Sequence, residues 1–279
     1  MISEIRRQFH QLTNIDPMRM GGGQKEVFRA ILNGEAVALK LIRVYASDQE
    51  RTEREIAAVT KLNSDYVPEI YDSGKCRIFG EERNYIIEQF IEGGTYRQIL
   101  DSRPVQELND VLFLADQLLK ACSDFETADL VHRDIKPGNL IIDPGGRVWI
   151  IDFGLVRHLD LPSVTPSGLF GVGTPGYAAP EQFRNLKFLI NIRADFFSIG
   201  VVLYEALRGY NPYFVPPTNQ LEIIRRVEQQ NLPRLSIPGD DGGFSEFINA
   251  LAQRFPSRRP QSAAEAIDWF VQIYSRLRR

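Results

Sequence analysis

The chain is poor in cysteine and histidine, the residues that build disulfide frameworks and most zinc sites. Its 279 residues include 2 cysteines and 3 histidines. Cys76 and Cys122 lie far apart, and neither belongs to a spacing typical of metal ligands. We therefore expect no disulfide framework and no zinc site, and we expect the protein to work in a reducing compartment.

A strong excess of one charge is also missing, because the formal net charge at pH 7 is −3. This balance does not predict nucleic acid or an anionic membrane as a partner. The most apolar stretch, Phe196 to Leu207, contains polar residues and is shorter than the about 20 residues that cross a bilayer. The first residues, MISEIRRQFH, lack the apolar core of a signal peptide. The sequence thus predicts a soluble cytoplasmic protein without a membrane partner.

What is present is an ordinary globular composition, 43% hydrophobic and 25% charged, in a chain long enough for one large domain or two lobes. The first third is rich in strand-like runs. Val27–Leu32 and Glu35–Ile42 flank Asn33-Gly34, a pair typical of a two-residue hairpin turn because both turn positions need a positive φ. We also expect a helix over residues 48–62, strands near 67–73, 76–79 and 84–90, and a turn at 80–82.

From Gly93-Gly94 onward the pattern is mostly helical. One apolar stripe at helical spacing comprises Val111, Leu114, Leu118, Cys122 and Phe125. Further helices are expected over residues 195–207, 221–230, 245–252 and 262–277, and two short strands over 140–142 and 148–151. Residues 152–181 are rich in Gly, Pro, Ser and Thr without any period, which predicts a long loop. Loops of that length inside a compact domain are usually functional.

The strongest chemical signal is the run HRDIKPGN, from His132 to Asn139, followed by Asp152. Asn139 and Asp152 offer two hard oxygen ligands, which suit Mg²⁺ shared with substrate phosphates. Asp134 can orient an attacking hydroxyl and accept its proton. Lys136 can neutralise charge on a transferred phosphoryl group. These residue types in this order indicate phosphoryl transfer.

Several strings together resemble the eukaryotic-like Ser/Thr protein kinase family over nearly the whole chain, from about Asp16 to Leu277. The matching strings are His132-Arg133-Asp134 through Asn139, Asp152-Phe153-Gly154, Ala179-Pro180-Glu181 and Val37-Ala38-Leu39-Lys40. The resemblance implies an ATP-dependent kinase that uses Mg²⁺, with Mn²⁺ as the alternative metal, and acts on protein substrates. The bare catalytic domain is similar to stand-alone bacterial kinases.

The resemblance also assigns an ATP site. Lys40 would contact the α- and β-phosphates and pair with a glutamate on the following helix, Glu55, with Glu53 as the rival. The nucleotide's adenine would then be held by three kinds of contact. The side chain of Ile87 would line the back of the pocket, the backbone of Glu88 and Phe90 would hydrogen-bond the adenine edge, and Ala38 and Val27 would pack on its faces.

The loop segment Gly173-Thr174-Pro175-Gly176-Tyr177 would receive the substrate peptide, with Thr174 approaching the catalytic aspartate. The pair formed by Lys136 and Thr174 resembles the one found in kinases that act on Ser or Thr, and not the one found in kinases that act on Tyr. Arg133 comes just before Asp134, and an arginine at this position is typical of kinases that are activated by a phosphate in this loop. The candidate phosphosites are Ser163, Thr165 and Ser167. The remaining implied roles are structural: an ion pair of Glu181 with Arg259, Asp195 bracing the catalytic loop, and a packed His132.

The chain departs from the family in its glycine-rich loop, where GxGxxGxV is expected before Val27. Only Gly22 falls on an expected glycine, and Met20 and Lys25 replace the other two. Gly21 and Gly23 still add glycines nearby, and glycine lets backbone N–H groups approach phosphate without a Cβ in the way. Lys25 could add a phosphate contact or hinder closure of the loop.

The expected fold is α+β, a bilobal protein-kinase-like fold in one kinase domain over residues 1–279. A small β-rich N-lobe would cover residues 1–90 and a larger helical C-lobe residues 91–279, with ATP and Mg²⁺ between them. Two alternatives stay open. A pseudokinase scaffold is favoured only by the irregular glycine loop, and a small-molecule phosphotransferase of similar fold is opposed by the segment from Gly173 to Glu181. The sequence does not reveal the protein substrate or the oligomeric state.

Overall fold

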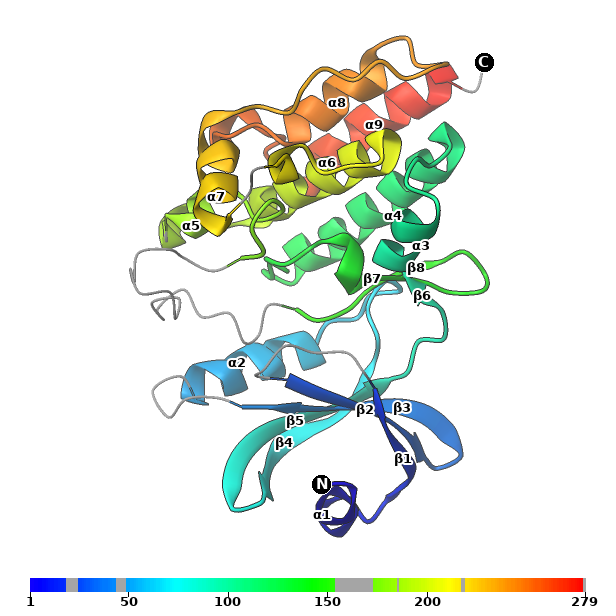
Figure 1. Cartoon of the computed structure of the whole chain (residues 1–279), viewed down its shortest axis with the longest axis vertical. Helices are drawn as coiled ribbons and strands as arrows, with labels where there is room; N and C mark the ends of the chain where they lie inside the picture. The colour runs from blue at the N-terminus through cyan, green and yellow to red at the C-terminus, as the bar shows by residue number, and fades with distance from the viewer. Residues whose placement is uncertain (19–24, 44–48, 154–172, 185, 217–218, 278–279) are drawn as a thin grey trace. The chain divides into compact units, whose positions relative to one another are not determined.

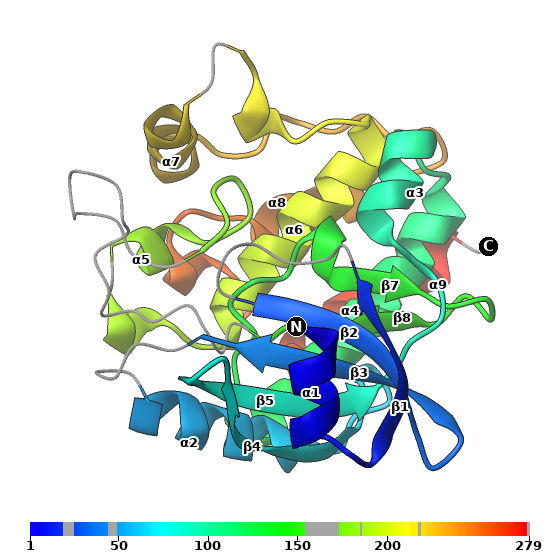
Figure 2. The ribbon, with the colours of Figure 1, turned by 60° about the horizontal axis from the view of Figure 1, so that its bottom comes forward.

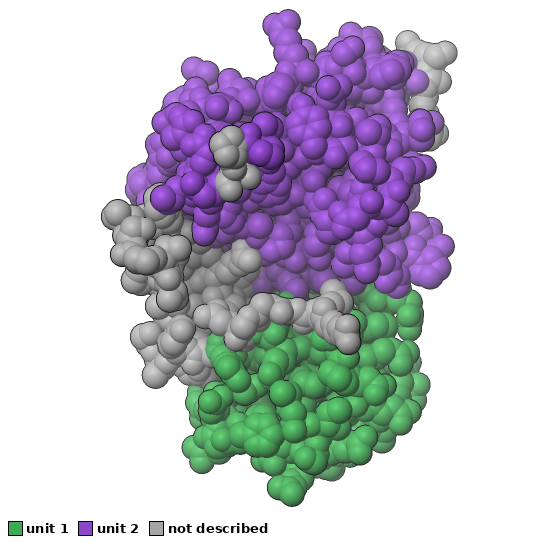
Figure 3. Space-filling view, in the orientation of Figure 1, with its two compact units in different colours: residues 1–63, 67–92 green, residues 64–66, 93–279 purple. Residues whose placement is uncertain are grey.

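The computed structural model describes residues 1–18, 25–43, 49–153, 173–184, 186–216 and 219–277. These residues form two compact units, which Figure 3 colours separately. Unit 1 comprises Met1–Asn63 and Val67–Glu92, and unit 2 comprises Ser64–Tyr66 and Gly93–Arg279. Unit 1 is rich in strands and unit 2 in helices, so the predicted α+β, bilobal kinase-like fold class is confirmed.

Unit 1 is built on a five-stranded antiparallel sheet with the strand order β1-β2-β3-β5-β4 (Figure 1). The strands are β1 Leu12–Met18, β2 Lys25–Leu32, β3 Glu35–Ile42, β4 Ile70–Ile78 and β5 Glu81–Gln89. In this order β3 and β5 are neighbours in the interior of the sheet, and each is paired on both sides. The centre of the sheet is therefore its most constrained part, because an interior strand has a hydrogen-bonded neighbour along both edges.

Two-residue turns close the β2–β3 and β4–β5 hairpins of this sheet. The predicted turn at Asn33-Gly34 is confirmed, with φ values of 52° and 91°. The second turn was expected at residues 80–82 but lies one position earlier, at Phe79 and Gly80, whose φ values are 50° and 80°. Both turns thus have two successive residues in the left-handed region, which matches the twist of the flanking strands. The two strands expected at 67–73 and 76–79 are one continuous strand, β4.

One face of the sheet is covered by a short helix, α1 (Ile2–Gln8), that the sequence did not predict. Figure 2 shows α1 lying across the sheet. Ile5 and Phe9 join a buried apolar cluster with strand residues that alternate along β3 and β5, among them Val37, Leu39, Leu41 and Ile87. Residues between these positions, such as Ala38 and Lys40, face the other side because successive side chains of a strand point to opposite faces. Helix α2 (Gln49–Thr60) follows β3 and contacts β4.

Unit 2 packs its helices around α6 (Ile192–Arg208), most of whose residues are buried. Helix α6 contacts α4 (Leu108–Thr127) and α8 (Gly243–Leu251), and α9 (Ala263–Leu277) contacts α4. The whole predicted stripe of α4, from Val111 to Phe125, is buried. The remaining α-helices are α3 Tyr96–Ser102, α5 Pro180–Phe183 and α7 Gln220–Gln229. Within the described ranges, no helix has both the length and the apolar character needed to cross a membrane.

A small antiparallel sheet carries the catalytic segment of unit 2. Its strand order is β6-β7-β8, with β6 Gly94–Thr95, β7 Leu140–Ile142 and β8 Val148–Ile150. A single 3₁₀ turn, η2 (Pro137–Asn139), leads into β7. Residues Ser64–Tyr66, distant in sequence, support this sheet, because the N–H of Ile150 donates to the carbonyl of Tyr66 at 2.7 Å. The loop of residues 132–139 therefore lies in the chain between helix α4 and the first long strand of this anchored sheet, β7.

Candidate active site

The catalytic loop is held in shape by Asp195 from the buried helix α6. Its carboxylate accepts the backbone N–H of His132 at 2.7 Å and that of Arg133 at 2.8 Å. Arg133 has a φ of 67°, a region that non-glycine residues rarely adopt. Complete burial raises the pKa of the Asp195 carboxyl to about 6, while the two N–H donors oppose the rise. The bracing role expected for Asp195 is confirmed by these contacts.

Three polar side chains meet at the Asp134 carboxylate. The Thr174 hydroxyl donates to one oxygen at 2.6 Å, and the Lys136 ammonium lies 2.9 Å from the other. The same ammonium donates to the Thr174 hydroxyl at 2.8 Å. The amide nitrogen of Asn139 also donates to Asp134, at 2.9 Å to the side chain and 2.9 Å to the backbone carbonyl. The expected approach of Thr174 to Asp134 is confirmed, and the Asp134 carboxylate is oriented by donors on both oxygens.

Asn139 and Asp152 are brought together by a backbone hydrogen bond. The N–H of Ile151 donates to the carbonyl of Asn139 at 2.9 Å, which places the next residue, Asp152, beside Asn139. Asp152 has a φ of 62°, so the backbone turns sharply just after β8. The nitrogen of the Asn139 amide donates to Asp134, which leaves the amide oxygen as the atom that a cation would bind. One amide oxygen and one carboxylate fit Mg²⁺, which keeps other positions for water and phosphate oxygens.

His132 connects the catalytic loop to the segment that carries Asp152. Its ring is buried, its Nε2 lies 3.1 Å from the Ile151 carbonyl, and its Nδ1 lies 3.3 Å from the backbone nitrogen of Asp134. These partners correspond to a neutral ring with the proton on Nε2. The ring centroid also lies 4.7 Å from that of Phe153. Burial lowers the pKa of His132 to about 4. The interpretation of His132 as a packed, structural residue is confirmed by its burial and by the backbone partners of both ring nitrogens.

This buried histidine predicts a pH dependence of stability. Its pKa is lowered from about 6.5 to about 4 on folding, so the unfolded chain binds more protons between these values. The contribution of His132 to stability is therefore complete above pH 6.5 and is lost as the pH falls toward 4, by on the order of 3 kcal/mol. We expect the free energy of unfolding of His132→Phe, measured by denaturant titration, to fall less steeply in this window than that of the wild type.

The raised pKa of Asp195 has the opposite effect on stability, which it increases as the pH falls. This effect is present in both proteins, so the difference between their slopes reports His132. His10→Gln, which removes an exposed histidine, is the matched control and should keep the wild-type slope. Equal slopes for the wild type and His132→Phe would contradict the prediction.

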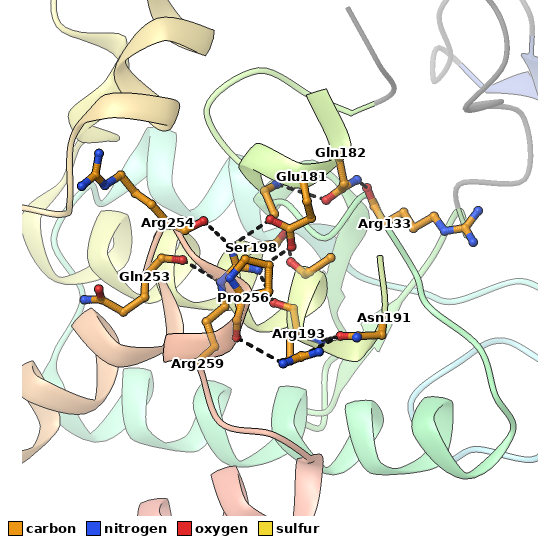
Figure 4. Close-up of polar contacts among 12 residues, drawn as sticks. Arg133, Glu181, Gln182, Asn191, Arg193, Ser198, Gln253, Arg254, Pro256 and Arg259 are labelled. Atoms are coloured by element: carbon orange, nitrogen blue, oxygen red, sulfur yellow. Dashed lines mark hydrogen bonds and ion pairs between the residues drawn. The ribbon is translucent and has the colours of Figure 1, made fainter. Parts of the chain in front are cut away.

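The segment of residues 173–183, which is expected to receive the substrate peptide, is anchored both to the core of unit 2 and to the loop of residues 132–139 (Figure 4). Glu181 forms the expected ion pair with Arg259, at 2.6 and 3.0 Å, and both side chains are buried. The neighbouring Gln182 donates from its amide to the carbonyl of Arg133 at 2.9 Å, which links α5 to the catalytic loop. The Ser198 hydroxyl of α6 donates to the carbonyl of Tyr177 at 2.9 Å. The start of α5 is thus fixed against both the core and the loop.

A second network holding this segment was missed by the sequence analysis. The Tyr177 hydroxyl donates to the Glu205 carboxylate at 2.5 Å, and the Arg97 guanidinium contacts both side chains, at 2.9 and 2.7 Å. Asn211 donates to the carbonyl of Gly176 at 3.1 Å. Arg97, Glu205 and Asn211 come from three separate helices or turns, and no local spacing relates them. The sequence contained one signal for this network. Glu205 is a charged residue within the apolar stretch of α6, and a buried charge needs a partner.

In unit 1 the residues around Lys40 correct part of the predicted adenine site. Val27, Ala38 and Lys40 share one face of the sheet. Ile87 is opposite Leu39 and belongs to the buried cluster on the other face, so the prediction that it lines the pocket with them is wrong. The physical reason is strand alternation, which turns Glu88 instead of Ile87 toward Ala38.

One backbone group expected to hold adenine is engaged within unit 1. The N–H of Phe90 donates to the carbonyl of Ala36 at 3.3 Å, and the other predicted backbone contacts of Glu88 and Phe90 with adenine stay predictions. Glu88 lies within β5 and is paired in register with Ala38 of β3 and Ile70 of β4. Its side chain forms an ion pair with Lys40. Glu53, the rival partner for Lys40, contacts Lys75 at 2.7 Å.

Several predicted residues lie outside the described part of the chain. These are Gly21, Gly22 and Gly23 with Met20 in the glycine-rich loop, and the candidate phosphosites Ser163, Thr165 and Ser167. Glu55 lies within helix α2, but the structure does not describe its side chain. Their predicted roles stay predictions.

Comparisons with known proteins agree with this geometry. Residues 18–270 match the family described as protein kinase domain. Serine/threonine-protein kinase PknL of Mycobacterium bovis is 33% identical over 246 residues, which cover 85% of this chain and 59% of the relative. Serine/threonine-protein kinase PknA of Mycobacterium tuberculosis is 35% identical over 199 residues, which cover 69% of this chain and 46% of the relative.

A third relative, the probable serine/threonine-protein kinase PknB of Bifidobacterium longum, is 32% identical over 230 residues, which cover 78% of this chain and 33% of the relative. This chain therefore spans about three fifths of the length of the first of these relatives and less of the other two. The match to the family covers most of the chain and includes the catalytic loop. The chain belongs to the protein kinase family, within the eukaryotic-like serine/threonine kinases that include these bacterial relatives.

Proposed function

We propose that this chain transfers the γ-phosphoryl group of ATP to Ser or Thr hydroxyl groups of protein substrates. The observation that carries the proposal is the contact of the Thr174 hydroxyl with Asp134 at 2.6 Å, with the Lys136 ammonium beside both. The structure thus contains a hydroxyl that already donates to the proposed base. A substrate hydroxyl needs the same acceptor to lose its proton.

The proposed reaction assigns a role to each of these side chains. The substrate oxygen forms a bond to the γ-phosphorus while the bond from that phosphorus to the bridging oxygen breaks and ADP leaves. Asp134 accepts the proton of the attacking hydroxyl. Lys136, 2.9 Å from Asp134, places a positive charge next to the transferred group. Little covalent chemistry is required of the protein, so orientation and charge account for most of the rate.

Asn139 and Asp152 would hold the metal ion, Mg²⁺ or alternatively Mn²⁺. When bound, the ion supplies positive charge to the phosphate oxygens of the nucleotide. The protein's own part is to fix the two ligands, which it does through the hydrogen bond from Ile151 to Asn139 and the contacts of Asn139 with Asp134. Val27, Ala38 and Lys40 share one face of unit 1, and we assign the nucleotide's base to the first two and its phosphates to Lys40.

The test is phosphate transfer from labelled ATP to a generic protein substrate in the presence of Mg²⁺ or Mn²⁺. We expect phosphoserine and phosphothreonine in the product and a loss of at least about 10²-fold for Lys40→Met, because the ammonium at the phosphates is removed. The proposal fails if the wild type transfers no more phosphate to protein than Lys40→Met does with either metal.

The same sample can separate the two alternatives. A pseudokinase scaffold would transfer no phosphate, and a small-molecule phosphotransferase would label an added small alcohol or amine and leave protein unlabelled. Mass spectrometry of the active wild type also tests whether the chain phosphorylates its own loop. We expect phosphate on Ser163, Thr165 or Ser167, and an active chain without phosphate there would contradict that expectation.

A further inference from the structure

Glu205 places a carboxylate inside unit 2, near the end of the buried helix α6. Its side chain is 6% exposed, and burial of a carboxylate is costly unless charged or polar partners replace the lost water. The Tyr177 hydroxyl donates to one of its oxygens at 2.5 Å, and the Arg97 guanidinium donates to the other at 2.7 Å. The carboxylate is therefore held by one group from the segment of residues 173–183 and one from helix α3.

Arg97 holds both of the other side chains at once. One nitrogen of its guanidinium, Nη2, donates to the Tyr177 hydroxyl at 2.9 Å and to Glu205, so the three side chains form a closed triangle of hydrogen bonds. Burial and the adjacent carboxylate raise the pKa of Tyr177, so its hydroxyl stays protonated and donates to Glu205. Arg97 is 36% exposed and also lies 3.4 Å from Asp101, one turn later on α3. The guanidinium is thus the solvent-facing corner of an otherwise buried network.

The network reaches the proposed base through the backbone of the segment. The N–H groups of Tyr177 and Ala178 donate to the carbonyl of Thr174, at 3.1 and 3.0 Å, so a displacement of Tyr177 also displaces Thr174. The Thr174 hydroxyl donates to Asp134 at 2.6 Å. Arg97 contacts Tyr177, three residues along the chain from Thr174, and can therefore influence the reaction by positioning this segment.

Removal of the guanidinium has a specific physical consequence. The Glu205 carboxylate stays buried without its positive partner, which is strongly destabilising. The carboxylate regains water only if its surroundings open. Helix α6 cannot yield easily, because most of its residues are buried, whereas Tyr177 is hydrogen-bonded directly to the carboxylate. The loss of the charge on Arg97 should therefore loosen the segment of residues 173–183.

We propose that Arg97 of α3 is a positioning residue for the protein substrate of the kinase. It neutralises the Glu205 carboxylate, so that Tyr177 fixes the segment of residues 173–183 in the shape that receives the substrate peptide. The kinetic part of this inference rests on the proposed kinase function. The effect of Arg97 on the segment can be tested without any phosphoryl transfer.

The first experiment measures amide hydrogen exchange of the nucleotide-free protein by mass spectrometry. Peptides that contain Tyr177 and Ala178 report on the segment, because both N–H groups are hydrogen-bonded to Thr174. We expect these peptides to exchange several-fold faster in Arg97→Met, which keeps an apolar side chain of similar reach and removes the charge. Peptides of helix α9 are the internal reference and should exchange equally in both proteins. Equal exchange at Tyr177 and Ala178 would overturn the proposal.

The second experiment is steady-state kinetics with both substrates varied. Arg97→Met should lower kcat/KM for the protein substrate at least about tenfold, mainly through a higher KM. The KM for ATP should change less than about twofold, because the nucleotide is assigned to Val27, Ala38 and Lys40 of unit 1. A general loss of stability lowers the amount of active enzyme and does not raise the KM of one substrate alone. An unchanged KM for the protein substrate would overturn the positioning role.

The matched control is Arg103→Met, the same substitution at the end of the same helix. Arg103 forms an ion pair with Asp110 at 2.7 Å, and both side chains are more than half exposed. This variant should leave both the exchange of the segment and the KM for the protein substrate unchanged. Arg97→Lys keeps the charge with fewer hydrogen-bond donors and should lie between Arg97→Met and the wild type.

A double-mutant cycle separates the charge of Arg97 from its packing. Arg97→Met/Glu205→Gln leaves no unpaired charge, and the glutamine oxygen can still accept from the Tyr177 hydroxyl. Its exchange at Tyr177 and its KM for the protein substrate should lie closer to the wild type than those of Arg97→Met. Independent, additive effects of the two substitutions would overturn the proposal.

The cycle also keeps the proposal falsifiable if Arg97→Met does not fold. The double variant should then be the more stable of the two in thermal unfolding, and a double variant that is equally unstable would overturn the proposal. A wild type that transfers no phosphate would end the proposed function, whereas hydrogen exchange and the cycle would still decide whether Arg97 holds the segment.

Discussion

Replacing Asp134 by asparagine is expected to lower phosphate transfer by about 10²–10⁴-fold while the fold is retained. The substitution removes the carboxylate that we propose as the acceptor of the hydroxyl proton. An amide can still accept from Lys136 and Asn139 through its oxygen and can donate to the Thr174 hydroxyl through its nitrogen. The polar contacts of the loop therefore have acceptable partners, and the loss of rate reports the missing base.

The measurement is steady-state transfer to a protein substrate, beside thermal unfolding of both proteins. Asp101→Asn, the same change at an exposed position of α3, is the matched control and should keep wild-type activity. Retention of more than about a tenth of the wild-type rate by Asp134→Asn, at unchanged stability, would exclude Asp134 as the base.

We expect the largest loss of stability when the ion pair between Glu181 and Arg259 is broken. Both side chains are almost fully buried, and the guanidinium also donates to the carbonyls of Gln253, Arg193 and Arg254. Glu181→Gln leaves the arginine charge buried without its carboxylate, which costs on the order of 3–5 kcal/mol. Denaturant titration should show this loss, and phosphate transfer should fall with it because α5 also holds the catalytic loop through Gln182.

The matched control is an exposed ion pair of similar length. Arg103 and Asp110 are 2.7 Å apart, and both side chains are more than half exposed. Asp110→Asn should change the free energy of unfolding by no more than about 1 kcal/mol, because solvent screens such pairs. A loss at Glu181→Gln as small as that at Asp110→Asn would show that burial does not govern the energetics of this pair.

Local patterns were sufficient for much of the fold. Asn33-Gly34 predicted its hairpin because few residue pairs adopt two successive positive φ angles. The spacing from Val111 to Phe125 predicted α4, whose apolar stripe is buried along its whole length. The turn at Phe79 was misplaced by one residue, because phenylalanine is an uncommon residue at positive φ and carries no turn signal.

Other features depend on contacts that a local pattern does not encode. Helix α1 is short and rich in charge, and it exists because Ile5 and Phe9 cover an apolar face supplied by the strands. The expected direction of the Ile87 side chain was wrong, because Ile86, Ile87 and Glu88 are buried in succession and such a run hides the alternation between faces.

The sequence by itself determined which chemical groups are available: the carboxylates of Asp134 and Asp152, the amide of Asn139 and the amine of Lys136, in an order that the kinase family shares. The tertiary structure decided which of these groups meet, such as Thr174 with Asp134, and which carboxylate accompanies Lys40. The reason is physical. Reactivity depends on residue type, which the chain carries in its order, whereas pairing depends on strand register and burial, which exist only once distant segments have packed together.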